Sequence, residues 1–283
     1  MKPRGPNFLV VGAQRSGTSW LYSTLKRHPE LWLPPIKEIH HFDNELKGRS
    51  WADPKRWRRA FGTHWGMLDV WMLKYFLGDN SDDWYASLFH QAQLQGRIAG
   101  EITPAYATLS KDAFARIRQL NRDVRIVFVM RDPVQRAWSA VTRRHLPGSL
   151  TLEKALAILR RPNHMARSAY TETISRLESV FPSSQLHFCF FDDLREYPER
   201  FVADILSFLA VNENQATEIV LPPTTRSARA RPMPPQLQRE MAKQFLPMIR
   251  ELCDRFDGPP QRWLAQSESL VARQPVERPR NAS

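Results

Sequence analysis

The chain has 283 residues, of which 42% are apolar and 25% are charged, and its formal net charge is +12. This composition is that of an ordinary globular protein, and it excludes wholesale disorder and collagen-like or coiled-coil architectures. No apolar run approaches the roughly 18 residues of a membrane-spanning helix, so an integral membrane protein is not expected. The basic excess predicts an anionic partner without choosing among nucleic acid, anionic membrane, phosphorylated cofactor and acidic polymer.

The amino terminus and the cysteines both bear on the cellular compartment of the protein. The basic amino end lacks the roughly 7–15-residue apolar centre of a signal peptide. Cys189 and Cys253 lie in apolar patterns without pairing or metal spacing, which suits thiols in a reducing compartment. We therefore expect a cytoplasmic protein.

The first expected element is a short apolar strand, Phe8–Val11, followed by a glycine loop and a helix of roughly Ser19–His28. Further strands are expected at 97–101, 125–130 and 186–191. The helices expected between and after them cover 112–120, 133–145, 152–159, 169–180, 198–209 and 236–256. This alternation predicts an α/β fold with a mostly parallel sheet covered on both faces, which binds ligands at the carboxyl ends of its strands.

Two stretches stand apart from this alternation. The segment 44–95 is rich in tryptophan; these rings suit a sugar-binding cleft, but packing in a core or lid is the stronger interpretation. The tryptophans in question are Trp51, Trp57, Trp65, Trp71 and Trp84. The polar tail 264–283 is expected to be disordered, which leaves a single domain over residues 1–263.

The loop from Gly12 to Thr18 ends a buried strand and opens a helix. Such a loop directs backbone N–H groups and the positive end of the helix at one point, where a phosphate-type group is stabilised. The spacing of Gly12 and Gly17 matches the phosphate loop of nucleotide-triphosphate enzymes, but Thr18 stands where those enzymes have lysine, and Arg15 is the basic residue. An ordinary glycine-rich turn is the alternative, and a standard ATP-binding loop is disfavoured.

A second junction of the same kind begins at Arg131, where a buried strand again leads into a helix. By itself, Arg131-Asp132-Pro133 is as well explained by a local ion pair and a helix start. Two such junctions in one sheet favour a ligand with two separated phosphate-like groups.

These motifs, in this order, resemble those of the PAPS-dependent sulfotransferases, whose sulfuryl donor is 3′-phosphoadenosine 5′-phosphosulfate (PAPS). Val11–Leu21 is similar to the family's 5′-phosphosulfate loop, and Val129–Ser139 is similar to its 3′-phosphate element. Lys37–Asp43 resembles the Glu-x-His-Phe-Phe-Asp stretch of heparan sulfate O-sulfotransferases and their bacterial relatives. The resemblance implies a single α/β domain with a central parallel sheet, related to the P-loop nucleotide kinases.

The resemblance also assigns roles to individual residues. Glu38 matches the catalytic base, His40 a nearby family histidine, and Arg15 the residue that stabilises the leaving group. Arg131 and Ser139 match the 3′-phosphate site, over which a basic loop at Arg226–Arg231 is expected to close. The donor loop would comprise Gly12, Ala13, Gln14, Arg15, Ser16, Gly17, Thr18, Ser19 and Trp20. Without the resemblance, a glutamate beside a lysine is most often a solvated surface pair.

Three departures from the family pattern limit the analogy. Arg15 replaces a lysine, His41 replaces a phenylalanine, and Ile102 stands where heparan-type enzymes often carry lysine. A cation is thus missing at position 102, and Lys37 or an arginine of the 226–231 loop is the candidate replacement.

The expected function is transfer of a sulfuryl group from PAPS to a hydroxyl or amine of a glycan or small metabolite. The expectation includes no metal, no nucleic acid and no membrane as partner. Two alternatives stay open: a P-loop kinase-like phosphotransferase, which the missing lysine after Gly17 disfavours, and a non-catalytic binder of an anionic polymer. Neither the acceptor nor the oligomeric state can be read from the sequence.

Overall fold

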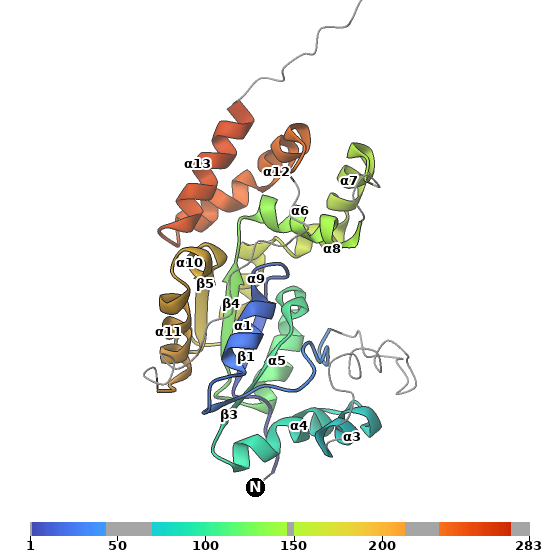
Figure 1. Cartoon of the computed structure of the whole chain (residues 1–283), viewed down its shortest axis with the longest axis vertical. Helices are drawn as coiled ribbons and strands as arrows, with labels where there is room; N and C mark the ends of the chain where they lie inside the picture. Colours follow the sequence, from blue (N-terminus) through green and yellow to red (C-terminus); the bar gives the residue numbers. More distant parts are fainter. Residues whose placement is uncertain (1, 44–69, 146–149, 213–231, 273–283) are drawn as a thin grey trace, which may run out of the picture. The chain divides into compact units, whose positions relative to one another are not determined.

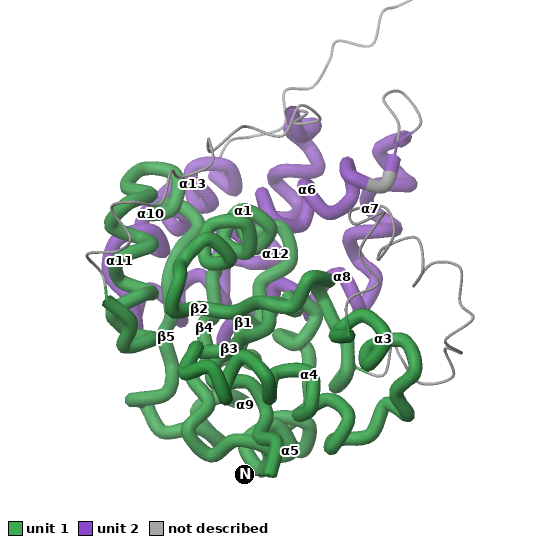
Figure 2. Tube along the Cα trace, turned by 60° about the horizontal axis from the view of Figure 1, so that its bottom comes forward, with its two compact units in different colours: residues 1–130, 172–224 green, residues 131–171, 225–283 purple. Residues whose placement is uncertain are grey.

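The computed structural model describes residues 2–43, 70–145, 150–212 and 232–272. The chain divides into two compact units (Figure 2): unit 1 comprises residues 1–130 and 172–224, and unit 2 comprises residues 131–171 and 225–283. Unit 1 contains the sheet, whereas the described part of unit 2 is helical.

Unit 1 is built around a five-stranded parallel sheet with the strand order β2-β3-β1-β4-β5 (Figure 1). The strands are β1 (Phe8–Gly12), β2 (Leu31–Trp32), β3 (Ile98–Ile102), β4 (Arg125–Met130) and β5 (Leu186–Phe190). The register pairs Val10 of β1 with Ile102 of β3 on one side and with Val127 of β4 on the other. The expected strands are confirmed within one residue at either end. Only β2 escaped prediction, because two residues cannot show an alternation.

Both faces of the sheet are covered. One face packs against α1 (Thr18–Leu25) and α11 (Pro198–Leu209) in a cluster that includes Phe8, Val10 and Val127. The residues that alternate with them are equally buried, and α5 (Lys111–Leu120) and α9 (Tyr170–Glu178) lie on that other side of the sheet in Figures 1 and 2. The strands are mostly apolar because helices cover both faces of the sheet; Glu101 of β3, Arg125 of β4 and His187 of β5 are the polar exceptions. This confirms the predicted α/β fold.

Part of the tryptophan-rich stretch forms two helices, α3 (Val70–Leu77) and α4 (Asp82–Leu94). The indole N–H of Trp71 donates to the Leu88 carbonyl at 2.9 Å, and that of Trp84 donates to the Lys74 carbonyl at 2.7 Å. Each bond joins one helix to the other, so these two tryptophans have the packing role that was the stronger interpretation. Trp51, Trp57 and Trp65 lie outside the described residues.

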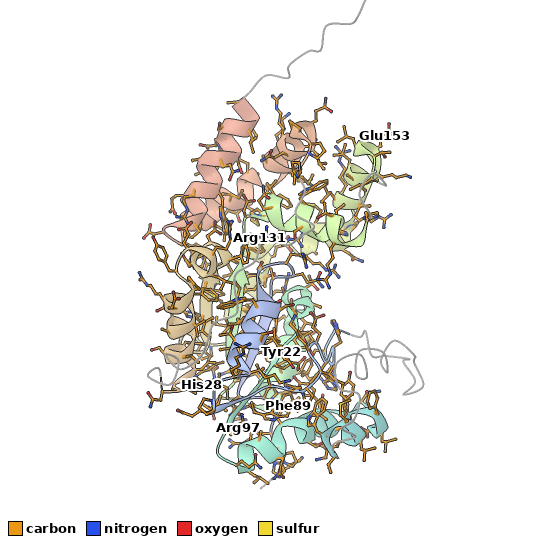
Figure 3. The ribbon with its side chains drawn as sticks, in the orientation of Figure 1. Tyr22, His28, Phe89, Arg97, Arg131 and Glu153 are labelled. Carbon is orange, nitrogen blue, oxygen red and sulfur yellow. The ribbon has the colours of Figure 1, made fainter. Side chains whose placement is uncertain are left out.

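Three short elements complete unit 1: η1 (Pro104–Thr108), η2 (Ser183–Gln185) and α10 (Phe191–Glu196). At the amino ends of β2 and β3, the Arg97 side chain donates to the carbonyls of Pro29 and Leu31. Figure 3 shows Arg97 and His28 at this end of the sheet. The glycine loop begins at the carboxyl end of β1, which lies at the opposite end of the sheet. Arg97 therefore lies far from the candidate site.

Unit 2 contains α6 (Pro133–Arg144), α7 (Leu152–Leu159), α8 (Pro162–Ala166), α12 (Pro235–Cys253) and α13 (Pro259–Ala272). The Asp132 carboxylate caps α6 by accepting from the backbone N–H groups of Val134 at 2.8 Å and Gln135 at 3.1 Å. The helix-start interpretation of Asp132 is therefore confirmed.

The structure corrects the expectation that the chain is disordered from Leu264 onward. Residues 264–272 continue α13, because Trp263 and Ser267 are buried and Glu268 accepts from Arg250 of α12 at 2.9 Å. A polar sequence reads as unstructured when its stabilising contacts lie far away in the chain. Residues 273–283 lie outside the described residues, and the domain boundary at 263 stays a prediction.

Candidate active site

The glycine loop joins β1 to α1 at the carboxyl end of the central strand. The backbone N–H of Ala13 donates to the Val129 carbonyl of β4 at 2.7 Å, and that of Ser16 donates back to the Ala13 carbonyl at 3.2 Å. Arg15 and Gly17 have left-handed φ values of 73° and 79°. The loop is therefore a tight turn fastened to the end of the neighbouring strand.

The two glycines of the loop are needed for packing inside the protein. A Cβ on Gly12 would lie 2.7 Å from Ala107 and 2.8 Å from Phe128, and one on Gly17 would lie 2.4 Å from Leu194. The left-handed φ of Gly17 is a second requirement, since other residues adopt it at a cost. Internal packing at both positions, and the backbone conformation at Gly17, thus call for glycine.

The donors of the loop fit an oxyanion. Helix α1 starts at Gly17 without a side-chain cap, so the positive helix end lies at the loop. The Ser16 hydroxyl is fully buried beside it and has no hydrogen-bond partner among the described residues. A buried polar group without a partner is costly, and a bound phosphate-type oxygen would satisfy it.

The segment 34–43 lies across the start of α1. The Tyr22 hydroxyl, on α1, donates to the Pro34 carbonyl at 2.6 Å and contacts the Pro35 carbonyl at 3.1 Å; Figure 3 labels Tyr22. Immediately after these prolines, the Lys37 ammonium donates to the Ser19 hydroxyl at 3.3 Å and to Glu38 Oε1 at 2.9 Å. Tyr22 therefore holds the segment so that Lys37 and Glu38 lie at the end of the glycine loop.

Glu38, His40 and Asp43 form a connected chain of side chains. His40 Nδ1 lies 2.6 Å from Asp43 Oδ2, and His40 Nε2 lies 3.4 Å from Glu38 Oε2. Glu38 and His40 have φ values of 65° and 62°. Such conformations are costly for residues with a Cβ and gather at functional sites. The local backbone thus turns alternate side chains, Glu38 and His40, toward each other.

The pKa of Glu38 reflects these neighbours. Burial by itself raises the pKa of the carboxyl, but the hydrogen bonds and charges of His40 and Lys37 outweigh burial and lower the pKa to about 2. Glu38 is therefore ionised at neutral pH. An ionised carboxylate can accept a proton, although its basicity is weak while both neighbours hold it.

A second carboxyl group lies at the end of β3. Glu101 is 1% exposed and accepts hydrogen bonds from the hydroxyls of Tyr85 and Thr103. Burial raises its pKa even though those hydroxyls favour the ionised form. The Tyr106 hydroxyl is hydrogen-bonded to Glu101 and accepts from the backbone N–H of His41 at 2.9 Å. Tyr106 of η1 therefore links the 37–43 segment to Glu101 of β3.

His41 is held in a cluster of aromatic and charged side chains. Its ring stacks on Tyr85 at 4.4 Å, and its Nε2 lies 2.8 Å from Asp82 Oδ1. Arg116 completes this ion pair from α5, with its Nε 2.8 Å from Asp82 Oδ2. Burial lowers the pKa of His41. The cluster fixes α4 and α5 to the segment that carries Glu38.

The second predicted junction belongs to unit 2. Arg131 follows Met130, the last residue of β4, and its carbonyl accepts from the Tyr170 hydroxyl at 2.8 Å. Both Arg131 and Ser139 are half-buried. The structure thus places Arg131 at the strand-to-helix turn expected for it, and Ser139 within α6. Arg226 and the rest of the 226–231 loop lie outside the described residues.

Three supporting residues escaped the sequence reasoning, which gave no role to Asp43, Glu101 or Tyr22. Asp43 lies in the 37–43 motif that the resemblance had marked, and Glu101 adjoins Ile102, a position that the resemblance had also singled out, so both had a usable signal. Tyr22 carries no signal of its own, because its contact to Pro34 arises only when α1 folds back beside the segment.

Within the described ranges, no three His, Cys, Asp or Glu side chains are grouped to hold a metal ion. In the same ranges, no helix combines the length and the apolar character needed to cross a bilayer. The expectations of a metal-free reaction and of a cytoplasmic location stay predictions.

The fold and the loop define a class before any comparison: α/β proteins with a parallel sheet and a glycine loop that leads from the carboxyl end of the first strand into a helix. The model of the family described as "Sulfotransferase family" matches residues 6–215. The chain therefore belongs to the sulfotransferase family.

Relatives and solved structures agree with this assignment. The chain is 28% identical over 134 residues to the membrane-associated sulfotransferase kil1 of Dictyostelium discoideum, covering 47% of this chain and 22% of kil1. It is 29% identical over 138 residues to heparan sulfate glucosamine 3-O-sulfotransferase 3A1 of Mus musculus, covering 49% of this chain and 26% of that enzyme. The matches thus span about a quarter of the length of these relatives.

Two solved structures share the fold. A sulfotransferase from Alicyclobacillus acidocaldarius aligns with a TM-score of 0.63 at 24% identity, covering 91% of this chain and 98% of that one. Mouse sulfotransferase SULT7A1, solved in complex with PAP, aligns with a TM-score of 0.54 at 13% identity, covering 95% of this chain and 91% of that one. The sulfotransferase fold expected from the motifs is confirmed.

Proposed function

We propose that the protein transfers a sulfuryl group from PAPS to a hydroxyl or amine group of a glycan or small metabolite. The observation that carries the proposal is the placement of the Lys37–Glu38 pair against the hydroxyls at the end of the glycine loop. A proton acceptor beside an oxyanion loop is the arrangement that group transfer from a phosphosulfate requires. Membership of the family supports the same conclusion.

The reaction is an in-line displacement at sulfur. The acceptor oxygen or nitrogen forms a bond to sulfur, while the bond from sulfur to the 5′-phosphate oxygen breaks and its electron pair stays on the phosphate. Glu38 accepts the proton that the acceptor loses. Arg15, the Ser16 hydroxyl and the loop N–H groups stabilise the negative charge that develops on the leaving phosphate.

The remaining predicted residues position these groups. His40, held by Asp43, orients the Glu38 carboxylate from the side opposite to Lys37. Arg131 and Ser139 bind the 3′-phosphate, with Arg226 as a further contact. The product is then 3′-phosphoadenosine 5′-phosphate (PAP). The 3′-phosphate and the 5′-phosphosulfate give the donor PAPS two separate points of attachment.

Nucleotide binding tests this function against its alternatives. Calorimetry with PAP and with ATP–Mg²⁺ should show binding of PAP alone; binding of ATP–Mg²⁺ alone favours a kinase. Salt-sensitive binding of heparin without affinity for either nucleotide favours a polymer binder.

Arg131→Ala tests the 3′-phosphate assignment. The variant should weaken PAP binding about 100-fold, as expected for loss of a charged phosphate contact. Arg160→Ala, which removes an exposed arginine paired with Glu240 in the same unit, is the control and should leave PAP affinity unchanged. Normal PAP binding by Arg131→Ala would remove Arg131 from the donor site.

A further inference from the structure

Lys37 contacts both halves of the proposed site at once. Its ammonium lies 3.5 Å from the Thr18 hydroxyl and 3.3 Å from the Ser19 hydroxyl, both in the first turn of α1. It also lies 2.9 Å from Glu38 Oε1. An ammonium group has three donors, so Lys37 bridges the loop that would hold the donor and the group that would accept the proton.

The position of Lys37 is well defined. Its side chain is 18% exposed, and the two prolines just before it are held by the Tyr22 hydroxyl. The hydrogen bonds from α1 therefore restrict where the ammonium can reach. A mostly buried cation held at a helix start is unlike a solvated surface lysine.

Position 102, where the resemblance leaves a cation missing, cannot supply charge in this chain. Ile102 is 1% exposed and belongs to the apolar cluster that packs the sheet against α1 and α11. Its side chain therefore serves the core. Lys37 is the lysine that the described structure places at the end of the glycine loop.

We propose that Lys37 is a catalytic residue whose ammonium leaves Glu38 to bind an oxygen of the transferring sulfonate when the donor is bound. The inference rests on the proposed function. The anionic sulfonate would take the place of the Glu38 carboxylate as the charged partner of the ammonium, so a hydrogen bond between charged groups is kept. The ammonium keeps its three protons throughout; the only proton transferred goes from the acceptor to Glu38.

The same movement adjusts the base. In the resting protein, Glu38 faces Lys37 and His40, and behind His40 lie Asp43 and the buried Glu101. Lys37 is one of the two residues that lower the pKa of Glu38. When the ammonium turns to the sulfonate, the carboxylate regains basicity at the step that needs a base.

Binding of two nucleotides tests Lys37 without an acceptor. Because Lys37 is proposed to contact the sulfonate, Lys37→Met should weaken PAPS binding about tenfold, while PAP affinity changes by less than about threefold. Lys37→Arg should keep most of the preference because it keeps the charge. Lys111→Met, which removes an exposed lysine from the start of α5, is the matched control and should change neither affinity.

A pH profile gives the second readout, using release of labelled sulfate from PAPS to water. In the wild-type protein, the acidic limb of kcat/KM reports Glu38 in the free enzyme, and that of kcat reports it in the complex. Lys37→Met should move the kcat/KM limb to higher pH and lower kcat about 100-fold, while the kcat limb stays near its wild-type position. A purely structural role would not separate the two limbs.

The outcomes are distinguishable. If wild-type protein binds neither PAP nor PAPS, the proposed function fails. If it binds both, and Lys37→Met retains the wild-type ratio of the two affinities with an intact fold by thermal melting, only the inference about Lys37 fails. Loss of the ratio in Lys37→Met and its recovery in Lys37→Arg would support the proposal.

Discussion

Glu38 and Glu101 are two carboxyl groups in one unit whose surroundings act on them in opposite directions. Glu38 lies near the loop, partly exposed, with Lys37 and His40 beside it, and its pKa is lowered. Glu101 lies at the end of β3, fully buried among hydroxyl groups, and its pKa is raised. Charged neighbours decide the first case and burial decides the second.

The difference is the reason why we propose only Glu38 as the proton acceptor. Glu38 is ionised at neutral pH. Lys37 links it to the hydroxyls of Thr18 and Ser19 at the end of the glycine loop. Glu101 has its oxygens occupied by Tyr85 and Thr103 and is closed to solvent. A perturbed pKa alone would mark both groups as candidates; the surrounding contacts separate them.

Replacing each carboxyl by an amide gives the largest expected contrast. Glu38→Gln should lower sulfuryl transfer from labelled PAPS at least about 1,000-fold, because it removes the base, and should leave the calorimetric affinity for PAP within about threefold. Glu101→Gln should retain at least about a tenth of the turnover. Equal losses in both variants would end the distinction between the two carboxyls.

Stability should respond in the reverse order. In Glu101→Gln, one hydroxyl donor loses its acceptor and faces an amide NH₂ group in the core, so we expect the free energy of unfolding to fall by about 1–3 kcal/mol. Glu38→Gln should change it by less at neutral pH. Urea denaturation of both variants measures this, and a Glu101→Gln protein as stable as the wild type would contradict the buried network.

The pH dependence of stability should carry the signature of Glu38. A pKa below its ordinary value of 4.5 means that the ion pairs of Glu38 stabilise the folded state above about pH 4.5 and are lost as the pH falls toward 2. We expect a contribution of about 1–2 kcal/mol, reduced by partial exposure to solvent. As the pH is lowered from 5 to 2.5, the measured free energy of unfolding should fall less steeply in Glu38→Gln than in the wild type.

Glu101 has the opposite sign in the same experiment. Its raised pKa favours the protonated folded state, so the stability associated with that group is present at low pH and decreases as the pH rises through its folded-state pKa. Glu101→Gln should therefore flatten the profile on the alkaline side. If the pH dependence of the free energy of unfolding changed in the same way in both variants, the opposite pKa shifts of Glu38 and Glu101 would be contradicted.

The smallest expected effect belongs to the buried hydroxyl of Ser16. Ser16→Ala should weaken PAP binding about fivefold, because it removes one oxyanion donor, and should leave the free energy of unfolding within about 0.5 kcal/mol. Ser23→Ala, which removes an exposed hydroxyl of α1 bonded to the Ser19 carbonyl, is the control. Unchanged PAP affinity in Ser16→Ala would exclude its hydroxyl from the donor site.

Much of the fold and of the site could be predicted because the signals are local. Buried parallel strands are mostly apolar, so Arg125–Met130 is recognisable from its residues alone. The glycine loop and the Glu38–His40 spacing are short motifs whose chemistry is contained in a few consecutive residues. The segment 264–272 was missed because its helix depends on contacts with α12, such as Arg250 with Glu268.

The amino-acid sequence by itself determined the alternating strands and helices, the position of the glycine loop at the end of the first strand, and the short motif that carries Glu38 and His40. Only the tertiary structure decided that Lys37 bridges that loop and Glu38, that Glu101 is buried among hydroxyls, and that the loop glycines are required by internal packing. The physical reason is that hydrogen bonds, charge pairs and burial join residues distant in the chain, and no pattern of neighbouring residues records them.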